Sequence, residues 1–332
     1  GDLLANFKNH MIHCDAGPRV VRAYSVQPDG AGYRSDSRDL LSSKDDWFRP
    51  SDACVAPDGS VYVADWNDAG VGGHYMADQK LESMTGRIYR IAPKGHRASV
   101  PNLDLNSAEG AAAALKSPNH ATRYLAWTKL NQMKGAAEPA LKKLWEGRDP
   151  IMRARAWNLL VRIPGQEQQY LEAAVKDGSP DIRNLALRYV QAENKDPIPT
   201  VKRLVKDSSP AVRRECALSL FMNQSSDAPG LWATLAQQHD GKDRWYLEAL
   251  GIGAKNQDDR FFAAWLQKVG DDWNTPAGRD IIWRIRSAKA PALLVKIIKD
   301  SATPRSERDR YLRSLDFIKG PERDAALVEL LN

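Results

Sequence analysis

Long hydrophobic runs are absent from this sequence of 332 residues. No stretch approaches the roughly 18 consecutive apolar residues that a membrane-spanning helix requires, so we expect no such helix within this chain. The opening GDLLANFKNH also lacks the basic start and the unbroken apolar core of a secretory signal peptide. If the protein is exported, we expect its signal to lie upstream of this segment.

Cysteine is scarce, and its arrangement disfavours several kinds of site. Cys14, Cys54 and Cys216 are an odd, scattered set, which argues against a disulfide framework and leaves the cellular compartment undecided. No Cys-x-x-Cys-His occurs, so we expect no covalently attached haem in this chain. A zinc site at His10, His13 and Cys14 is disfavoured, because residues three apart on a strand point to opposite faces and no second ligand pair follows.

Motifs for nucleotide and hydrolase chemistry are missing as well. The sequence has no phosphate-binding loop, no nucleophile elbow and no dinucleotide-binding fingerprint. The first hundred residues carry no excess of either charge, since they hold 12 Lys or Arg against 13 Asp or Glu, whereas the remaining residues hold 36 against 29. The basic balance therefore belongs to the second part of the chain, where it permits an acidic partner without requiring one.

The stretch from Trp47 to Gly95 has the pattern of a three-stranded antiparallel sheet. Residues 53–56 (ACVA) and 61–64 (VYVA) are short apolar runs around Pro-Asp-Gly-Ser, a turn in which Gly59 can supply a positive φ. The third run, RIYRI at residues 87–91, alternates with period two, and we expect both of its arginines on the face away from the core. Such a sheet is blade-like and cannot bury its faces alone.

Residues 1–46 have the pattern of a preceding blade. We expect strands at Met11–Cys14, Val20–Val26 and Tyr33–Leu41, with a turn at residues 27–30 (QPDG). Two blades leave open strand edges, which propellers avoid by closing the ring. We therefore expect the chain to be a fragment, or its remaining blades to come from sequence outside it.

Two sets of sequence segments resemble known proteins. FRPSDACVAPDGSVYVADW and GRIYRIAPKG resemble a closing blade of the six-bladed propellers of soluble quinoprotein glucose and sorbosone dehydrogenases. DWNDAGVGGH and GPRVVRAYSVQPDGAGY resemble more closely the membrane-bound dehydrogenase-like proteins of planctomycetes and verrucomicrobia, which join a propeller to helical HEAT repeats and often to a c-type haem domain. The resemblance covers about the first hundred residues and implies a periplasmic or cell-envelope protein.

The resemblance also implies a cofactor at the mouth of the blade. In quinoprotein dehydrogenases an anionic tricyclic quinone, pyrroloquinoline quinone, is held with calcium where the innermost strands begin. The matching residues here are Arg49, Asp52 and Arg87, of which Arg49 would pair with the quinone carboxylates and Asp52 with the ion. The family's base histidine lies in earlier blades, so the catalytic residue is unknown in this chain. An Arg49 to Asp52 pair that only locks the start of the strand fits the sequence equally well.

The segment from Asp65 to Asp78 is the best candidate for a metal site in its own right. Asp65, Asp68 and His74 would place oxygen and imidazole ligands around a glycine-rich backbone, and calcium takes carboxylate and carbonyl oxygens. The alternative is that the two aspartates cap turns while His74 bonds a backbone carbonyl. The sequence favours this alternative, because no ligand spacing as tight as that of an EF-hand is present.

From Ser107 onward the apolar residues recur at helical spacing, and the sequence repeats itself. DPIMRARAWNLL at 149, SPDIRNLALRYV at 179 and SPAVRRECALSL at 209 superpose with a period of 30. Each copy starts with Asp or Ser as N-cap and Pro as the first helical residue. Positions two, six and ten past each proline share one helix face, which we expect to be buried. They are Met152, Ala156 and Leu160, then Ile182, Ala186 and Val190, then Val212, Cys216 and Leu220.

The arginine three past the proline extends this array to neighbouring segments, where the proline is missing. It lies at Arg123, Arg153, Arg183, Arg213, Arg244, Arg279 and Arg308. We expect partner helices at Glu138–Trp145, Gln166–Lys176, Pro197–Lys206, Pro229–Gln238, Asp258–Val269, Ala290–Lys299 and Pro321–Leu331. The predicted fold class is therefore a β plus α chain, with a partial β-propeller at 1–97, a linker at 98–106 and a HEAT-like α-solenoid of about seven helix pairs at 107–332.

The repeated arginine has two interpretations. It could form a basic stripe that grips nucleic-acid phosphates. However, each of the three aspartates that end preceding helices lies close enough in sequence to pair with the next arginine, so an internal ladder is favoured and nucleic acid is disfavoured as a partner. Those pairs would be Asp177 with Arg183, Asp207 with Arg213 and Asp300 with Arg308. We expect Trp145, Trp157, Trp232, Trp265 and Trp283 to fill space between helices.

Two functions from different classes follow. The first is that the chain is the distal part of a quinoprotein-like sugar or alcohol dehydrogenase, whose solenoid docks a protein partner such as a cytochrome or haem domain. Because a propeller active site draws residues from most blades, we expect this segment to be inactive alone. The second is a non-catalytic scaffold of propeller and HEAT repeats that binds protein or polysaccharide.

Overall fold

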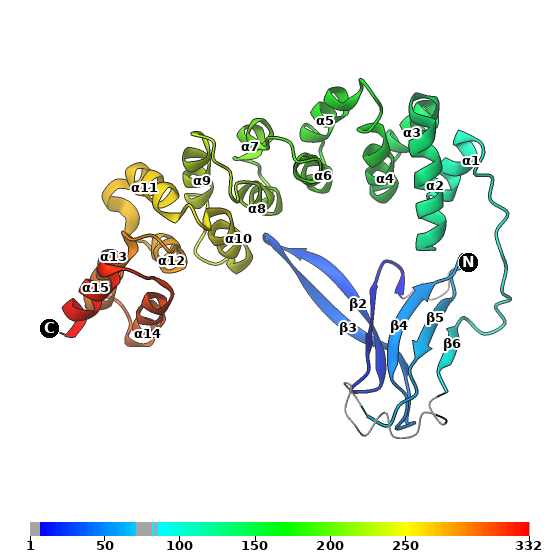
Figure 1. The fold of residues 1–332 in the computed structure, drawn as a ribbon, viewed down its shortest axis with the longest axis horizontal. Coiled ribbons are helices and arrows are strands. Elements are labelled where there is room, and N and C mark those ends of the chain that lie inside the picture. The colour runs from blue at the N-terminus through cyan, green and yellow to red at the C-terminus, as the bar shows by residue number, and fades with distance from the viewer. Residues whose placement is uncertain (1–6, 71–81, 83–84, 332) are drawn as a thin grey trace. The chain divides into compact units, whose positions relative to one another are not determined.

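The computed structural model describes residues 7–70, 82 and 85–331. Two small antiparallel sheets, each of three strands in sequence order, precede a region of paired helices (Figure 1). This confirms the predicted fold class. The strands are β1 (Met11–Asp15), β2 (Val20–Asp29), β3 (Gly32–Ser42), β4 (Pro50–Val55), β5 (Val61–Asp65) and β6 (Arg87–Ile91).

The helices begin after the last strand, from Ala108 onward, and come mostly in pairs. Their bounds are α1 (Ala108–Ala114), α2 (His120–Met133), α3 (Glu138–Trp145), α4 (Pro150–Leu160), α5 (Glu167–Val175), α6 (Pro180–Ala192), α7 (Ile198–Leu204), α8 (Pro210–Ser219), α9 (Ala228–Ala236), α10 (Arg244–Ala254), α11 (Asp258–Val269), α12 (Pro276–Arg284), α13 (Ala290–Lys299), α14 (Arg305–Ser314) and α15 (Pro321–Leu331). Short 3₁₀ turns are η3 (Lys134–Ala137), η4 (Gly270–Trp273) and η5 (Leu315–Phe317). Among the described residues, no helix is long and apolar enough to cross a membrane.

The chain divides into two compact units. Unit 1 comprises residues 1–27 and 33–171, and unit 2 comprises residues 28–32 and 172–332. The predicted boundaries at 97 and 107 concern a different division, the one between sheet and helix, and they stay predictions. Unit 1 therefore contains both sheets, apart from one hairpin tip, together with the first helices.

The turn between β4 and β5 forms as its sequence predicts. Gly59 has a φ of +86°, a conformation that costs glycine little because it has no Cβ. The Asp58 carboxylate accepts hydrogen bonds from the Ser60 backbone N–H at 2.9 Å and from its hydroxyl at 2.6 Å. These local bonds fix the turn, and they lower the pKa of Asp58 below its usual value.

The faces of β6 differ from our expectation. Arg87, Tyr89 and Ile91 share the more buried face, whereas Ile88 is 76% exposed and shares the other face with Arg90. The expectation that both arginines lie on one face is wrong, because positions three apart on a strand point to opposite sides. Arg87 is directly opposite Asp65 in the β5–β6 pairing.

The sheets share a small apolar core inside unit 1. Val21 of β2, Val61 and Val63 of β5, and Phe48 before β4 are buried together. The Phe48 ring meets the Tyr89 ring edge to face, with 5.5 Å between centroids. This core fixes the start of β4 against β5 and β6, where the candidate site lies.

The helices start at the predicted residues, but the side chains that cap them differ from one helix to the next. Asp149, Ser179 and Ser209 are N-caps, each followed by proline at the first helical position. The Asp149 carboxylate accepts from the first backbone N–H groups of α4, but the two serine side chains make no capping bond. Instead, Asp177 and Asp207 each accept a hydrogen bond at 2.8 Å from the serine N–H two residues on.

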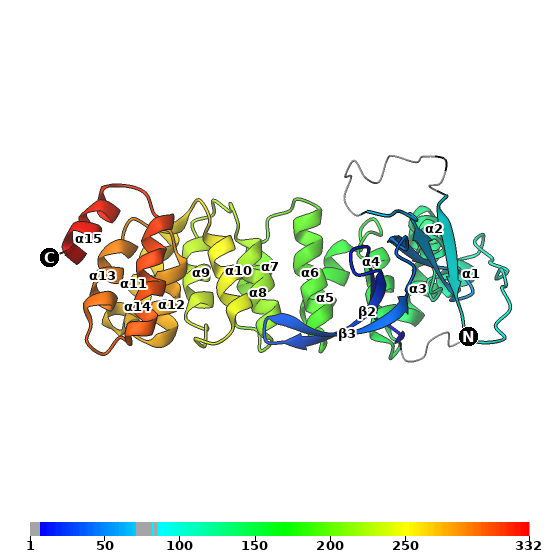
Figure 2. The same cartoon turned by 90° about the horizontal axis from the view of Figure 1, so that it is seen from below.

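Alternate helices of unit 2 pack on one another in two layers. The helices α6, α8, α10, α12 and α14 pack successively, and α7, α9 and α11 do the same (Figure 2). All nine repeat positions that the sequence places on one face are at most 6% exposed. This packing of helix pairs is consistent with repeats, because each pair buries its apolar face against its neighbours.

The repeated arginines form an internal ladder, with partners other than those expected. Arg183 binds the Asp207 carboxylate through Nε at 2.6 Å and Nη2 at 2.8 Å. Its Nη1 donates to the Asp177 carbonyl oxygen at 2.7 Å rather than to the carboxylate. Arg279 likewise pairs with Asp300 at 2.8 Å. In each pair the carboxylate follows the arginine in sequence, at the end of the partner helix, instead of preceding it.

The other ladder arginines also donate to the carbonyls that end the preceding segment. Arg213 donates to the Asp207 carbonyl oxygen and Arg308 to the Asp300 carbonyl oxygen, at 2.7 and 3.1 Å. The predicted carboxylate pairs of these two arginines are therefore wrong, because each guanidinium folds back onto backbone instead. This geometry explains why arginine recurs at the position, since its planar fork can satisfy carbonyls and a carboxylate at once.

Three of the five tryptophans that we expect to fill space between helices are buried. Trp157, Trp232 and Trp265 are at most 2% exposed. Trp145 and Trp283 are half-buried, and arginine guanidinium groups lie over their rings. The tryptophans therefore pack against helices and arginines.

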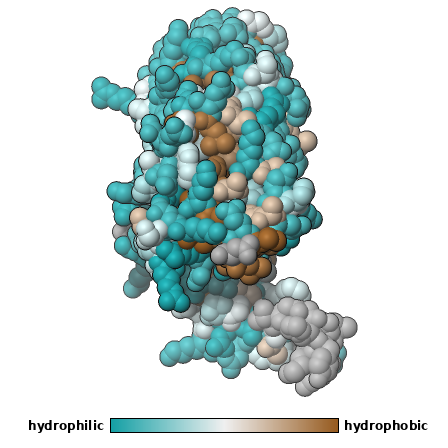
Figure 3. Space-filling model, turned by 90° about the vertical axis from the view of Figure 1, so that its left-hand side faces the viewer, coloured by the Kyte–Doolittle hydropathy of each residue, from teal (hydrophilic) through white to brown (hydrophobic). Residues whose placement is uncertain are grey.

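The surface around the C-terminal helices is mostly polar. Figure 3, which views the molecule from the side of its C-terminus, shows hydrophilic side chains over most of the visible face and hydrophobic groups in a narrow central row. Phe317 of η5 is 64% exposed and Leu331 of α15 is 88% exposed. These are single exposed apolar side chains, which are ordinary on a protein surface.

Candidate functional site

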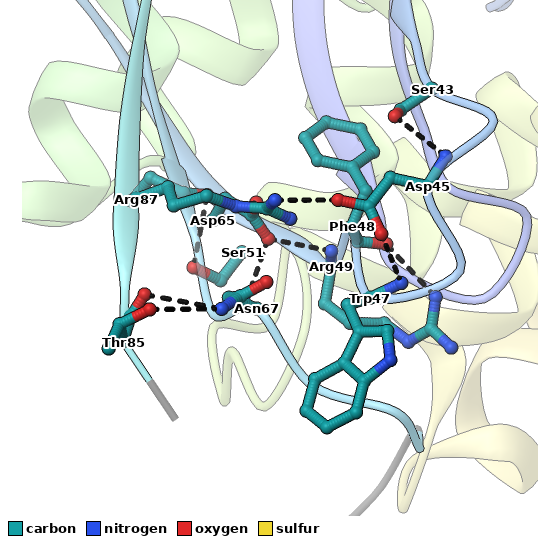
Figure 4. Close-up of polar contacts among 11 residues, drawn as sticks. Ser43, Asp45, Trp47, Phe48, Arg49, Ser51, Asp65, Asn67, Thr85 and Arg87 are labelled. Carbon is teal, nitrogen blue, oxygen red and sulfur yellow. Dashed lines mark hydrogen bonds and ion pairs between the residues drawn. The ribbon is translucent and has the colours of Figure 1, made fainter. Parts of the chain in front are cut away.

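The buried carboxylate of Asp65 is the centre of the candidate site at the mouth of the second sheet. Its side chain is fully buried at the end of β5. One oxygen accepts from the backbone N–H groups of Arg49, at 2.7 Å, and Asn67, at 2.9 Å, and the other accepts from Arg87 Nε at 2.7 Å (Figure 4). A buried carboxylate needs such compensation, because desolvation of an unpaired charge is costly.

Arg87 bridges two aspartates. From β6 it reaches Asp65 through Nε, and its Nη1 binds Asp45 at 2.6 Å (Figure 4). Asp45 also accepts from the Trp47 N–H at 2.9 Å, and this bond, followed by the Arg87 guanidinium, lowers the pKa of Asp45. The bond to Asp45 and the neighbouring Asp65 raise the pKa of Arg87. Arg87 is therefore a cation whose position is fixed by two aspartates.

One N–H donor of Arg87 lacks a hydrogen-bond partner. Its Nη2 is buried and has no hydrogen-bond partner among the residues that the structure describes. The Arg87 side chain as a whole is 31% exposed, so the guanidinium lies at the edge of the sheet rather than deep in its core. A guanidinium donor that is fixed in orientation and lacks a partner is suited to a carboxylate or another anion.

Arg49 directs its side chain at backbone. Within the described residues, the hydrogen bonds of its guanidinium go to the carbonyl oxygens of Phe48, Ala69 and Gly70, at 3.0 to 3.1 Å. In addition, the Asp68 carboxylate accepts from the Gly70 N–H at 3.0 Å. Arg49 and Asp68 together hold the chain that follows β5.

Asp52 is separate from this network. It is exposed, and its carboxylate accepts only a local bond from the Ala53 N–H at 2.8 Å. Across the described part of the chain, no ion pair joins Asp52 to Arg49. Burial, followed by the charge of Asp52, raises the pKa of the Cys14 thiol on the neighbouring strand β1. The structure thus brings Arg49, Asp65 and Arg87 together and leaves Asp52 outside.

The predicted metal ligands are only partly placed. Asp65 and Asp68 are both buried, at 3% and 5% exposure. His74 and Asp78 lie outside the described residues, so the metal assignment stays a prediction. Within the described residues, no group of three or more His, Cys, Asp or Glu is placed to hold a metal ion. A cation at Asp65 would have to compete with Arg87, which already balances that carboxylate.

Sequence reasoning missed Asp45 as a member of the site. It follows β3 in a turn, where the Asp45 N–H donates to the Ser43 hydroxyl at 3.1 Å (Figure 4). Its pairing with Arg87 joins residues 42 positions apart. No local pattern encodes a contact at that separation.

A second buried polar network, in unit 2, was also missed. His239 Nε2 lies 3.0 Å from one oxygen of Asp280, and Arg310 donates to the other at 2.7 Å. Burial raises the pKa of Asp280, but the bonds from His239 and Arg310 outweigh burial and lower it overall. The three residues come from three different helix pairs, so the network joins repeats.

Comparison with known protein families gives a match to the first part of the chain. Residues 1–95 match a family described as "Domain of unknown function (DUF7133)". No curated protein matches the chain. The match covers the two sheets and stops before the helices.

Proposed function

We propose that this chain is the distal part of a quinoprotein-like dehydrogenase that oxidises a sugar or a related alcohol. In this proposal the two sheets are closing blades of a β-propeller, and the paired helices are an arm that docks a protein partner. The support is the resemblance of residues 47–95 to quinoprotein blades and the arrangement around Arg87. The proposal also implies a periplasmic or cell-envelope location.

The observation that carries the proposal is the Nη2 donor of Arg87, which has no hydrogen-bond partner within the described residues. Asp45 and Asp65 hold the guanidinium in place through its other nitrogens, at 2.6 and 2.7 Å. A cofactor carboxylate at this strand end would find a donor that is already oriented, so little conformational entropy would be lost on binding. Arg87 would bind and orient, and the catalytic base would come from another blade.

The fit of pyrroloquinoline quinone to these residues is partial. When bound, such a quinone accepts two electrons from the alcohol carbon. Arg87 fits its carboxylates, whereas Arg49 already donates to three backbone carbonyls and would serve to hold the mouth of the sheet. Calcium remains part of the proposal through Asp68 and His74, with Asp52 as the exposed carboxylate nearest the start of β4.

The helical arm would supply the electron acceptor's docking surface. Stacked helix pairs expose long rows of side chains, which suits them to protein partners. The dehydrogenase chemistry requires an electron acceptor, and in this proposal it is a protein such as a cytochrome or haem domain. Nucleic acid is disfavoured as a partner, because the ladder arginines Arg183 and Arg279 already form ion pairs with internal aspartates.

A non-catalytic scaffold that binds protein or polysaccharide is the second candidate. The observation in its favour is that most polar groups at the mouth of the sheet bind one another. Asp65 accepts three internal hydrogen bonds, and the side chain of Arg49 donates to three backbone carbonyls. In that case the network would be purely structural.

Turnover by the full-length protein distinguishes the two candidates. The protein is supplied with pyrroloquinoline quinone and calcium, and dye reduction is followed with sugars as electron donors. We expect sugar-dependent dye reduction by the full-length protein and none by the present segment alone. Failure of the full-length protein to retain quinone and to reduce dye with any sugar would reject the dehydrogenase and leave the scaffold.

A further inference from the structure

A cavity of about 850 Å³ lies within unit 1, away from the mouth of the second sheet. Its walls come from the start of β1, the β4–β5 turn, the segment between α1 and α2, and the first turns of α2 and α4. A hydrogen bond of 2.7 Å from Asn119 Nδ2 to the Val55 carbonyl oxygen ties the end of β4 to the cap of α2. The size falls in the range of small-molecule sites.

The lining of this cavity is rich in positive charge. Lys8, Lys116, Arg123 and Arg155 all line it. None of them has an ion pair within the described residues. Apolar side chains such as that of Ile12 complete the wall. A concave surface that combines apolar walls with unpaired cations is suited to an organic anion.

The carboxylates of the lining are already engaged. Asp58 accepts from Ser60 and from Arg90, the latter at 3.4 Å. Asp149 accepts from the N–H groups of Ile151 and Met152, at 2.9 and 3.2 Å, as the cap of α4. Neither carboxylate therefore neutralises the cavity arginines by direct contact.

The repeat pattern explains why Arg123 is unpaired. In a later repeat, Arg183 uses Nε and Nη2 to bind Asp207, which lies 24 residues on. The residue 24 positions after Arg123 is Gly147, which has no side chain to offer. Arg123 keeps only the backbone bonds of its Nη1, to the carbonyl oxygens of residues 117 and 118, each at 2.8 Å. Its Nε and Nη2 have no hydrogen-bond partner in the part of the chain that the structure describes.

Arg155 faces the same cavity from α4. Its Nη1 donates to the Leu115 carbonyl oxygen at 2.5 Å. Burial, followed by the charge of Arg123, lowers the pKa of Arg155. Two half-buried guanidinium groups that repel each other across a cavity would be stabilised by an anion placed between them.

We propose that this cavity binds a small organic anion that carries phosphate or carboxylate groups, held by Arg123 and Arg155 with Lys116 at its edge. The site does not depend on the quinone proposal, because it shares no residue with the mouth of the second sheet. Its chemistry requires an oxyanion, since guanidinium groups bind phosphate and carboxylate oxygens through paired N–H donors.

Calorimetric titration of the whole 332-residue chain tests the site. The probes are inorganic pyrophosphate and citrate, each at constant ionic strength, and they separate phosphate from carboxylate recognition. The variants are Arg123→Gln, Arg155→Gln and Lys116→Gln, with Arg305→Gln as a matched control. Arg305 is an exposed arginine of α14 that does not line the cavity. Lys116 is exposed and its side chain makes no hydrogen bond within the described residues, so its replacement leaves packing intact even if Arg155→Gln fails to fold.

We expect saturable binding of at least one probe. Arg123→Gln and Arg155→Gln should each weaken it by about tenfold or more, with a smaller loss in Lys116→Gln. Arg305→Gln should stay within about twofold of the parent, as expected for a screened surface charge. The proposal is overturned if neither probe binds saturably, or if Arg123→Gln and Arg155→Gln weaken binding no more than Arg305→Gln does.

Discussion

At the scale of single residues, Asp65 is the position on which the candidate site depends. Its buried carboxylate is balanced by Arg87 and by two backbone N–H groups. Replacement by asparagine would leave Arg87 with one carboxylate instead of two and would give the Arg49 N–H a weaker acceptor. We expect Asp65→Asn to lower the free energy of unfolding by about 2 to 3 kcal/mol, measured by urea denaturation.

Asp52 provides the matched control for Asp65. It lies on the adjacent strand, is exposed, and makes only a local bond to Ala53. Asp52→Asn should change the free energy of unfolding by less than about 0.5 kcal/mol. Equal effects of the two substitutions would show that the network does not stabilise the sheet.

Asp280 makes the stability of the helical region depend on pH. Its pKa is lowered from 3.8 in the folded protein, where His239 and Arg310 bind it. A carboxyl group with a lowered folded pKa binds protons more readily in the unfolded chain, so its contribution is present above pH 3.8 and is lost as pH falls through the folded pKa. We expect Asp280→Asn to remove this part of the acid sensitivity.

Urea unfolding of the parent chain and of Asp280→Asn, over a series from about pH 6 down to the acid transition, measures this contribution. The stability gap between the two proteins should be constant above the unfolded pKa of 3.8 and should narrow below it. Asp309→Asn, on the exposed surface of α14, serves as the control. A gap that does not change with pH would mean that Asp280 acts through packing alone.

At the scale of elements, the arginine ladder can be tested at Arg183 of α6 and Asp207, which follows the partner helix α7. Both side chains are largely buried, at 12% and 7% exposure, and two N–H groups meet the carboxylate. In a double-mutant cycle with Arg183→Gln and Asp207→Asn, we expect a coupling energy of about 2 kcal/mol. Unfolding in guanidinium chloride gives the four required stabilities.

A more exposed ion pair nearby gives a reference coupling energy for this cycle. Arg188 is 54% exposed and lies 3.3 Å from Glu215. The cycle of Arg188→Gln with Glu215→Gln should give about 0.5 kcal/mol or less, because solvent screens an exposed cation. If the Arg183 cycle gives no larger coupling than this, the arginine does not stabilise the packing of α6 against the end of α7.

Element positions were largely predictable from sequence, because they depend on local chemistry. The alternating run at 87–91 and the helices at 258–269 and 290–299 have the predicted bounds. The face of Arg87 and Arg90 was mispredicted because period two was applied to residues three apart. The carboxylate partners of the arginines were mispredicted for another reason, since proximity in sequence does not determine which repeat supplies a side chain.

At the scale of the whole molecule, the order of sheets before helices followed from the change in hydrophobic period. The candidate site was only partly predictable. The resemblance to quinoprotein dehydrogenases pointed to Arg49 and Arg87, and the glycine-rich segment pointed to Asp65 as a metal ligand, but no pattern pointed to Asp45 or to the cavity between α2 and α4. Such contacts join segments far apart in the chain, and one sequence carries no local signal for them. Gly147 is the exception, since superposing the repeat copies shows glycine where the next two copies have Asp177 and Asp207.

Quinone binding by the full-length protein tests the central claim most directly. Pyrroloquinoline quinone is titrated in the presence of calcium, and the dissociation constant is compared between the parent, Arg87→Lys and the control Arg34→Lys. Lysine keeps the charge facing Asp45 and Asp65 but removes the open Nη2 donor, whereas Arg34 lies exposed on β3. We predict tight binding by the parent, about tenfold weaker binding by Arg87→Lys and no change in Arg34→Lys. Absence of quinone binding, or equal affinity in all three proteins, would contradict the account.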